Sequence, residues 1–359
     1  MYPETMANDN PDLAASPPPL LGVRRTLHGR LGQAAICVAL FLAVFSHREA
    51  EAADKLRIAV QKTGTFAWEL AIMRARGLDK QARLDIEITE LASPEATKIA
   101  LLGGAADIIL SDWLWVARQR NLGGRLVFVP YSTALGAVLV EAASPITDLA
   151  GLKGKKIAVA GGPLDKSWLL LQAFARESHF DIASEANVVY GAPALLYQKA
   201  TNGEADATLN YWNFCVALEA RGFRRLIGMD EVERRLGAKG PVAMVGYVFD
   251  EGFARSHADA LARFLKIAAE ARDILSHSDA DWENIDRKIR IGDKTQLALY
   301  RQSYSDGIPR RPVEEEFADA RVLYRALAKM GGPDLTGPAK ELDEETYYKG
   351  TVALAPRAH

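Results

Sequence analysis

The sequence predicts an α/β protein built from two similar, doubly wound lobes with a ligand cleft between them. Residues 104–113 and residues 203–212 share the pattern G-x-A-D-x-x-L-x-x-W. These two stretches begin 99 residues apart (203 − 104 = 99). Residues 58–60 and residues 157–159, which both read Ile-Ala-Val, are separated by the same 99 residues, so two independent matches support one repeat. A repeat of about a hundred residues has ordinary domain size and indicates two lobes. Alternating strand and helix patterns indicate mostly parallel sheets covered by helices.

The first of the two repeated units is expected to contain four strands and three helices. Apolar residues that alternate or run together predict strands at 55–60, 84–91, 106–110 and 125–131. The first helix begins after Thr65 and ends at Gly77, since glycine commonly ends helices. A second helix begins with Ser93-Pro94 and ends at Gly103, and a third covers 112–120.

The second copy repeats this rhythm. Its strands are expected at 155–160, 187–190, 207–210 and 225–228, and its helices at 165–176, 194–201 and 212–221. A strand at 242–249 and helices over 253–330 follow. We expect the helices to pack back on the first lobe, so that the chain crosses between lobes near 131–140 and 240–245. The expected lobes are 53–135 with 243–359, and 136–242.

The N-terminal residues have the three parts of an export signal. Arg24 and Arg25 precede an apolar run at 31–45, and Ala50-Glu51-Ala52 then offers small residues at the cleavage spacing. Residues 1–52 are therefore expected to be an extension plus signal peptide, cleaved near Ala52 or Ala53. A retained membrane anchor is the weaker alternative, because the run is short for a span. The remaining chain is expected to be a periplasmic monomer.

The composition narrows the functional classes. The chain of 359 residues is 49% hydrophobic and 25% charged, which is typical of a globular protein. Its net charge of −2 provides no basic field for nucleic acid, so we expect no such partner. The six histidines are scattered without metal-ligand spacing, so neither metal nor cofactor is expected. Cys215 alone follows the signal, and on an apolar helix face it is expected in the core rather than in catalysis.

Polar and aromatic side chains gather just after the predicted strands. In open α/β sheets, ligands bind at the carboxyl ends of strands, and a few polar groups on an aromatic wall are typical of a small-molecule site. The loop 160–167 lacks the glycines of a phosphate-binding loop, and Asp165 is expected to cap the helix that follows. The predicted ligand-binding residues are Thr63, Thr65, Phe66, Trp68, Ser111, Asp112, Trp113, Tyr131, Ser132, Gly161, Gly162, Asp165, Lys166, Ser167, Asn210, Tyr211 and Trp212.

Several stretches carry a family resemblance. Arg76-Gly77-Leu78, Leu84-Asp85-Ile86-Glu87, both G-x-A-D strands and the segment DLAGLKGKKIAV at 148–159 resemble the periplasmic solute-binding proteins of nitrate, sulfonate, taurine and thiamine-precursor ABC importers. The resemblance implies the type II binding-protein fold, a ligand clamped between lobes, and an inner-membrane permease with its ATPase as partners. The aromatic excess and Asp112 are more similar to the thiamine-pyrimidine branch, which favours a heterocyclic ligand over an alkanesulfonate, taurine or nitrate.

Two other functions stay open at this point. A pyrimidine synthase of the same superfamily relies on clustered cysteines and histidines, which this chain does not have, so no catalytic residues are expected. A ligand-sensing domain for a membrane receptor is the other alternative. For the transport reading we expect Trp113 and Trp212 to stack on the two faces of a flat ligand. Asp112 would bind its amino edge, and Lys166 and Ser167 an anionic edge.

Overall fold

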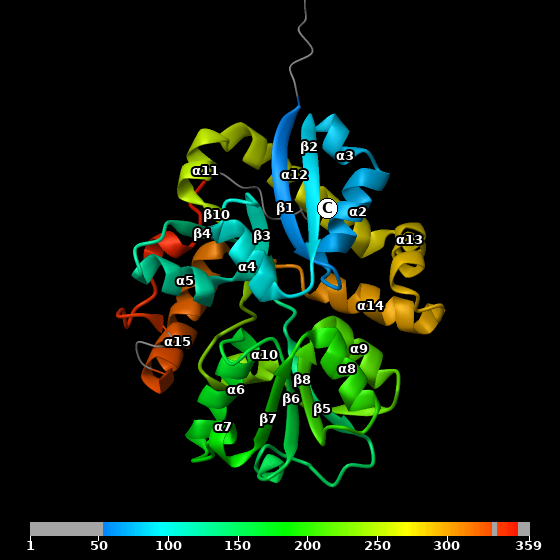
Figure 1. The fold of residues 1–359 in the computed structure, drawn as a ribbon, viewed down its shortest axis with the longest axis vertical. Helices are drawn as coiled ribbons and strands as arrows, with labels where there is room; N and C mark the ends of the chain where they lie inside the picture. Colours follow the sequence, from blue (N-terminus) through cyan, green and yellow to red (C-terminus); the bar gives the residue numbers. More distant parts are fainter. Residues whose placement is uncertain (1–52, 332–335, 351–359) are drawn as a thin grey trace, which may run out of the picture. The chain divides into compact units, whose positions relative to one another are not determined.

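Two five-stranded sheets form the framework of the computed structural model, which describes residues 53–331 and 336–350 (Figure 1). The first sheet has the order β2-β1-β3-β10-β4 and contains β1 (Asp54–Gln61), β2 (Leu84–Leu91), β3 (Ile108–Asp112), β4 (Leu126–Ser132) and β10 (Val245–Asp250). The second has the order β7-β6-β8-β5-β9 and contains β5 (Gly136–Glu141), β6 (Lys156–Ala160), β7 (Asn187–Gly191), β8 (Ala207–Tyr211) and β9 (Phe223–Gly228). The expected export signal at 1–52 lies outside the described residues.

Helices flank both sheets, which confirms the predicted two-lobed α/β architecture (Figure 1). The first lobe contains α2 (Phe66–Ala75), α3 (Leu78–Gln81), α4 (Pro94–Leu102), α5 (Trp113–Asn121), α11 (Glu251–Ser256), α12 (Ala258–His277) and α13 (Asp279–Ile289). The second contains η1 (Ala150–Leu152), α6 (Lys166–Glu177), α7 (Ile182–Glu185), α8 (Pro193–Thr201), α9 (Trp212–Glu219) and α10 (Met229–Arg235). Across the part of the chain that the structure describes, no helix combines the length and apolar character needed to cross a membrane.

Each sheet is mixed, with four strands that run in one direction and one strand that runs against them. In the first sheet β1 pairs in parallel with β2 and β3, whereas β10 runs antiparallel between β3 and β4. In the second sheet β6 pairs in parallel with β7 and β8, and β5 runs antiparallel between β8 and β9. The antiparallel strand of each sheet is the one that enters from the other lobe. Because it follows a strand or helix of the other lobe, no βαβ crossover within its own sheet sets its direction.

The sequence repeat corresponds to one structural role in each lobe. Asp107 Oδ2 accepts a hydrogen bond from the backbone N–H of Arg57 at 2.8 Å, and Asp206 Oδ2 accepts one from Lys156 N–H at 2.8 Å. The glycine that opens each motif has a positive φ, which an L-residue rarely adopts. Each motif therefore joins a tight turn to a neighbouring parallel strand, β1 in the first sheet and β6 in the second, and positions the strand that follows the turn, β3 or β8.

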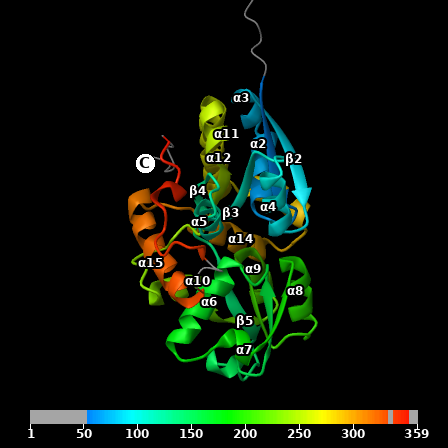
Figure 2. The same ribbon diagram turned by 60° about the vertical axis from the view of Figure 1, so that its left-hand side comes forward.

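The C-terminal helices contact both lobes. Helix α12 packs on α2 of the first lobe, as expected, while α14 (Lys294–Asp306) contacts both α12 and α9. Helix α15 (Val313–Gly331) contacts α6 of the second lobe, and Figure 2 shows it beside α6 and α10. The short helix η2 (Glu344–Thr346) precedes Tyr348, whose N–H donates to Phe128 O at 2.8 Å. The end of the described chain therefore joins the first sheet beside β4.

The same helices hold both crossings between the lobes. The first crossing lies between β4 and β5, where Thr133 N–H donates to the carbonyl of Gly307, just after α14, at 2.8 Å. The second lies between α10 and β10, where Ala243 N–H donates to Glu316 Oε2 of α15 at 3.3 Å. The segment from α14 to α15 thus braces both connections between the lobes.

Candidate functional site

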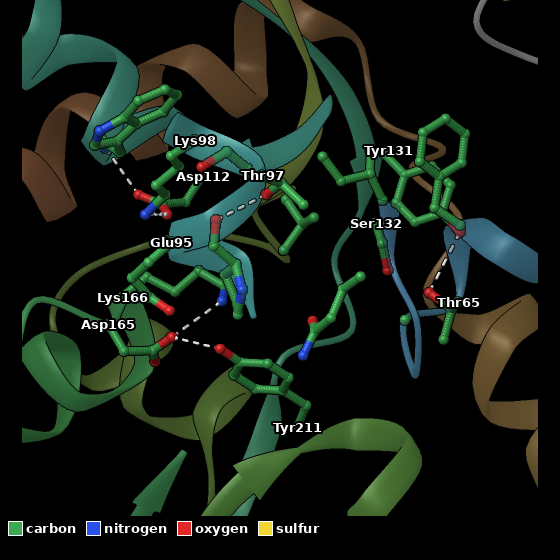
Figure 3. A pocket seen from close by; sticks show the side chains of 18 of the residues that line it. Thr65, Glu95, Thr97, Lys98, Asp112, Tyr131, Ser132, Asp165, Lys166 and Tyr211 are labelled. Carbon is green, nitrogen blue, oxygen red and sulfur yellow. Dashed lines mark hydrogen bonds and ion pairs between the residues drawn. The ribbon is translucent and has the colours of Figure 1, made fainter. Parts of the chain in front are cut away.

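A cavity of about 430 Å³ lies between the two lobes. Its first-lobe wall comes from the loop after β1, the start of α4 and the ends of β3 and β4 (Figure 3). Its second-lobe wall comes from the loop after β6 and from the junction of β8 with α9. The carboxyl ends of strands from both sheets therefore meet at this cavity, where ligands bind in open α/β sheets.

Most of the predicted site residues line this cavity. Those in its wall are Thr63, Thr65, Phe66, Ser111, Asp112, Tyr131, Ser132, Gly162, Asp165, Lys166, Tyr211 and Trp212. Those outside its wall are Trp68, Trp113, Gly161, Ser167 and Asn210.

The expected stacking of a ligand between Trp113 and Trp212 does not fit the structure. Trp113 is 0% exposed, because the first residue of α5 points into the core instead of the cleft. Trp212 does line the cavity, but its ring packs edge-on against Trp68 at 5.9 Å and against Tyr300 at 6.2 Å. Trp68 itself is buried beside Trp282 at 5.6 Å. Trp68, Trp113 and Trp282 are therefore core residues, and Trp212 packs against Trp68 of the other lobe.

Two of the other predicted residues outside the wall make hydrogen bonds that hold neighbouring backbone segments in place. Asn210 is buried, and its amide donates to Pro193 O at 3.1 Å while its Oδ1 accepts from Tyr211 N–H at 2.9 Å. Gly161 has a positive φ and donates its N–H to Gly191 O at 2.9 Å. Ser167 is 1% exposed. These residues shape the loops whose neighbours line the cavity.

Among the lining residues absent from the predicted set are two cationic side chains and one aromatic ring, those of Lys98, Arg118 and Trp115. All three lie on helices, whereas the predicted residues lie at or just after the ends of strands. A usable signal existed for Trp115, because an aspartate that caps a helix bonds to the N–H of its second or third residue. Asp112 as the cap of α5 therefore places Trp115 beside it.

In the first lobe, Asp112 binds a helix start and a lysine together. Its Oδ1 accepts a hydrogen bond from Trp115 N–H at 2.7 Å, which caps α5. Its Oδ2 lies 3.6 Å from Lys98 Nζ. The same ammonium lies 5.2 Å from the centroid of the Trp115 ring. All three side chains line the cavity, and we call them the first Asp–Lys–aromatic group.

The second lobe presents an analogous group, formed by Asp165, Lys166 and Tyr211 (Figure 3). Asp165 Oδ1 accepts from Ser167 N–H at 2.9 Å, which caps α6. Its Oδ2 accepts from Tyr211 Oη at 2.9 Å and lies 3.5 Å from Lys166 Nζ. That ammonium is 4.6 Å from the Tyr211 ring centroid. Burial, and next the charge of Asp165, hold the pKa of Tyr211 well above its usual value, so its hydroxyl stays a donor.

A buried polar cluster supports the first-lobe wall behind Tyr131. Tyr247 Oη donates to Glu69 Oε1 at 2.5 Å, and Arg272 lies 5.8 Å from the Tyr131 ring. Burial raises the pKa of Glu69 to about 7, although the charge of Arg272 opposes this shift. Tyr131 Oη in turn lies 3.4 Å from Thr65 Oγ1, which fixes the loop after β1. Tyr131 and Thr65 are thus held in place before any ligand arrives.

The described residues offer no cluster of metal ligands, and the thiol of Cys215 is buried. Within residues 53–331 and 336–350, no group of three or more His, Cys, Asp or Glu side chains could hold a metal ion. Cys215 is 0% exposed, and burial raises the pKa of its thiol to about 12. Its Sγ lies 3.2 Å from Asn210 O. The arrangement can hold a small polar ligand through carboxylates, ammonium groups, hydroxyls and aromatic rings.

Comparison with solved structures shows the fold. The chain is similar to the periplasmic aliphatic sulphonate binding protein SsuA from Escherichia coli, with a TM-score of 0.65 and 19% identity over 85% of this chain and 96% of that chain. It is equally similar to the alkanesulfonate-binding protein SsuA from Xanthomonas axonopodis pv. citri bound to MOPS, with a TM-score of 0.65 and 19% identity over 83% and 99% of the two chains. A Candida albicans protein with the generic periplasmic binding protein fold matches with a TM-score of 0.56 and 13% identity over 81% and 93%.

A model of a sequence family matches the larger part of the chain. No curated protein matches the sequence. A family model described as "NMT1/THI5 like" matches residues 71–277, which is more than half of the chain and includes parts of both sheets and most of the cavity wall. The protein therefore belongs to the NMT1/THI5-like family, and its fold is that of the periplasmic binding proteins.

Proposed function

We propose that this protein is an exported, non-enzymatic solute-binding protein that delivers a small organic nitrogen or sulfur compound to an ABC importer. The observation that carries the proposal is the cavity between the lobes, to which both sheets contribute strand ends. Its mixture of apolar wall and a few convergent polar groups is that of small-molecule sites. The similarity to two sulfonate-binding proteins supports the same general role.

Binding would close the lobes over the ligand by movement at the two crossings. Each lobe holds its own ligand-facing residues on short, capped helix starts, so each wall can move as a rigid body. The closed form would present both lobes to an inner-membrane permease, and the permease's ATPase would drive release. The protein would act as a periplasmic monomer after cleavage near Ala52 or Ala53. N-terminal sequencing of the periplasmic form tests that cleavage.

Among ligand classes we favour a thiamine-pyrimidine-like heterocycle over an alkanesulfonate, taurine or nitrate. The support is the aromatic content of the wall, which contains Phe66, Trp115, Tyr131, Tyr211, Trp212 and Phe214. An aromatic contact typically adds about 0.5–1.5 kcal/mol beyond the burial of apolar area. In this proposal Trp115, which lines the cavity, contacts the heterocycle, and the buried Trp113 does not.

The non-enzymatic role rests on the position of the thiol and on how the polar groups are used. A thiol with a pKa of about 12 is not a nucleophile at neutral pH. Asp112 and Asp165 are both engaged as helix caps. A bound ligand should therefore be recovered chemically unchanged after long incubation.

Native mass spectrometry of the protein, purified from its host without unfolding, tests the proposal. We expect a complex with one small molecule that dissociates on unfolding, and whose mass identifies the ligand. Protein that carries no small molecule, and whose melting temperature no compound of a metabolite library raises, would contradict the proposed function.

A further inference from the structure

Resting on the proposed function, we infer that Asp112 and Asp165 determine the charge of the ligand: they neutralise the two lysines of the cavity, so the site accepts a ligand without net negative charge and rejects small oxyanions. The two carboxylates come from different lobes, and both line the cavity. They are therefore specificity-determining residues of the proposed site.

The first step of the argument is the pairing of each lysine. Lys98 Nζ lies 3.6 Å from Asp112, and Lys166 Nζ lies 3.5 Å from Asp165. The side chains of Asp112 and Asp165 are only 10% and 8% exposed, so water screens these pairs weakly. Each ammonium also lies over an aromatic ring that lines the same cavity. An incoming oxyanion would have to compete with a carboxylate for either lysine.

The second step concerns the helix starts at the cavity. The free N–H groups at a helix N-terminus commonly bind anions. Helices α5 and α6 both begin at this cavity, but Asp112 Oδ1 accepts from Trp115 N–H and Asp165 Oδ1 accepts from Ser167 N–H. An oxyanion at either helix start would meet a carboxylate that already occupies the position. Repulsion there adds to the competition for the lysines.

The third step is the balance of the remaining wall. Its acidic residues are Glu95, Asp112 and Asp165, and its basic residues are Lys98, Arg118 and Lys166. Equal numbers of acids and bases leave no net positive charge for an anion. Ser111 is 7% exposed, and its hydroxyl has no hydrogen-bond partner within the described part of the chain. This neutral residue lines the cavity and adds no positive charge that would attract an anion.

Isothermal titration calorimetry with ethanesulfonate and with nitrate tests the inference. The variants are Asp112→Asn and Asp165→Asn, since asparagine caps helices about as well as aspartate and should preserve the fold. The matched control is Asp250→Asn, which changes the cap of α11 outside the cavity wall. We expect ethanesulfonate to bind each cavity variant at least about tenfold more tightly than the parent, the size of one charge-assisted hydrogen bond. The control should match the parent.

A double variant identifies the released group. Asp165→Asn combined with Lys166→Met should lose the gain in affinity, because the freed ammonium is then absent. The inference would be overturned if neither aspartate variant bound ethanesulfonate more tightly than the parent. These outcomes compare the parent with its variants for a defined probe. They are thus independent of whether a natural ligand co-purifies, which is the test of the proposed function.

Discussion

Three buried carboxylates hold the second crossing between the lobes, and we predict that two of them, Glu233 and Glu316, make the stability of the protein depend on pH. Glu233 comes from α10, and Glu316 and Asp319 come from α15. They accept backbone N–H hydrogen bonds, at 3.1–3.4 Å, from Val242, Ala243 and Gly240 respectively. The proposed closure of the lobes would bend this segment. Protonation of its carboxylates would therefore affect the closing movement as well as the stability.

The sign follows from the raised pKa of Glu316 and Glu233. Burial raises the pKa of Glu316 from 4.5 to about 7, with a further rise from Asp319 and opposition from Arg311. Burial also raises the pKa of Glu233 well above its usual value. The folded state therefore holds protons that the unfolded state releases. This contribution to stability is complete below about pH 4.5 and is lost as the pH rises through 7, by at most about 3 kcal/mol for Glu316.

The variant Glu316→Gln measures this contribution. Glutamine keeps an acceptor for Ala243 N–H but does not ionise, so we expect parent-like stability at low pH. Above the pKa we expect a gain of about 1–3 kcal/mol over the parent. Urea unfolding monitored across the pH range gives both values. Glu314→Gln, an exposed change on the same helix, should keep the parent profile. If Glu316→Gln also keeps that profile, the raised pKa is not what sets the pH dependence.

Three further predictions concern single positions. Gly136→Ala should destabilise the protein by about 2 kcal/mol or more in urea unfolding, because φ is +151° and the new Cβ would lie 2.0 Å from Asn210 O; parent-like unfolding would contradict this. Trp115→Ala should weaken binding of the co-purified ligand up to roughly tenfold in calorimetry, whereas Trp113→Phe should leave affinity unchanged; the reverse order would refute our assignment of the wall. The thiol of Cys215 should react with a thiol reagent only after unfolding, and rapid labelling of the folded protein would show that it is not buried.

The repeat made a large part of the fold predictable. Asp107 and Asp206 occupy equivalent positions and accept the same backbone hydrogen bond, from β1 in the first sheet and from β6 in the second. Strands β3 and β8 accordingly end at equivalent positions, Asp112 and Tyr211, and both reach the cavity. Local turn chemistry and strand periodicity were enough to place these residues because neither depends on distant parts of the chain.

Side-chain depth was not predictable in the same way. Trp113 and Trp212 are also equivalent in the repeat, yet the first lies in the core and the second in the cavity wall. The difference arises from what surrounds each helix: Trp212 meets Trp68, Tyr300 and Tyr304 across the lobes. Such contacts join residues far apart in the sequence, which a pattern within one helix does not reveal.

Some elements were not predicted because they depend on contacts with distant parts of the chain. Residues 136–141 were expected to belong to a crossing, but they form β5 because β8 and β9 supply partners on both sides. Helix α10 was not expected at all. The contact of α15 with α6 was likewise beyond reach, since helix periodicity identifies an apolar face but not the element that covers it.

The distance between the lobes, with and without ligand, tests the central claim most directly. Leu102 on α4 and Leu195 on α8 are 58% and 53% exposed, lie in different lobes and are outside the cavity wall. Cysteines at these positions can carry spin labels, while Cys215 stays buried and unlabelled. Electron–electron double resonance should give a shorter, narrower distance distribution for protein purified with its ligand than for protein stripped of ligand by unfolding and refolding. The same distribution in both samples would contradict a binding protein that closes its two lobes over a solute.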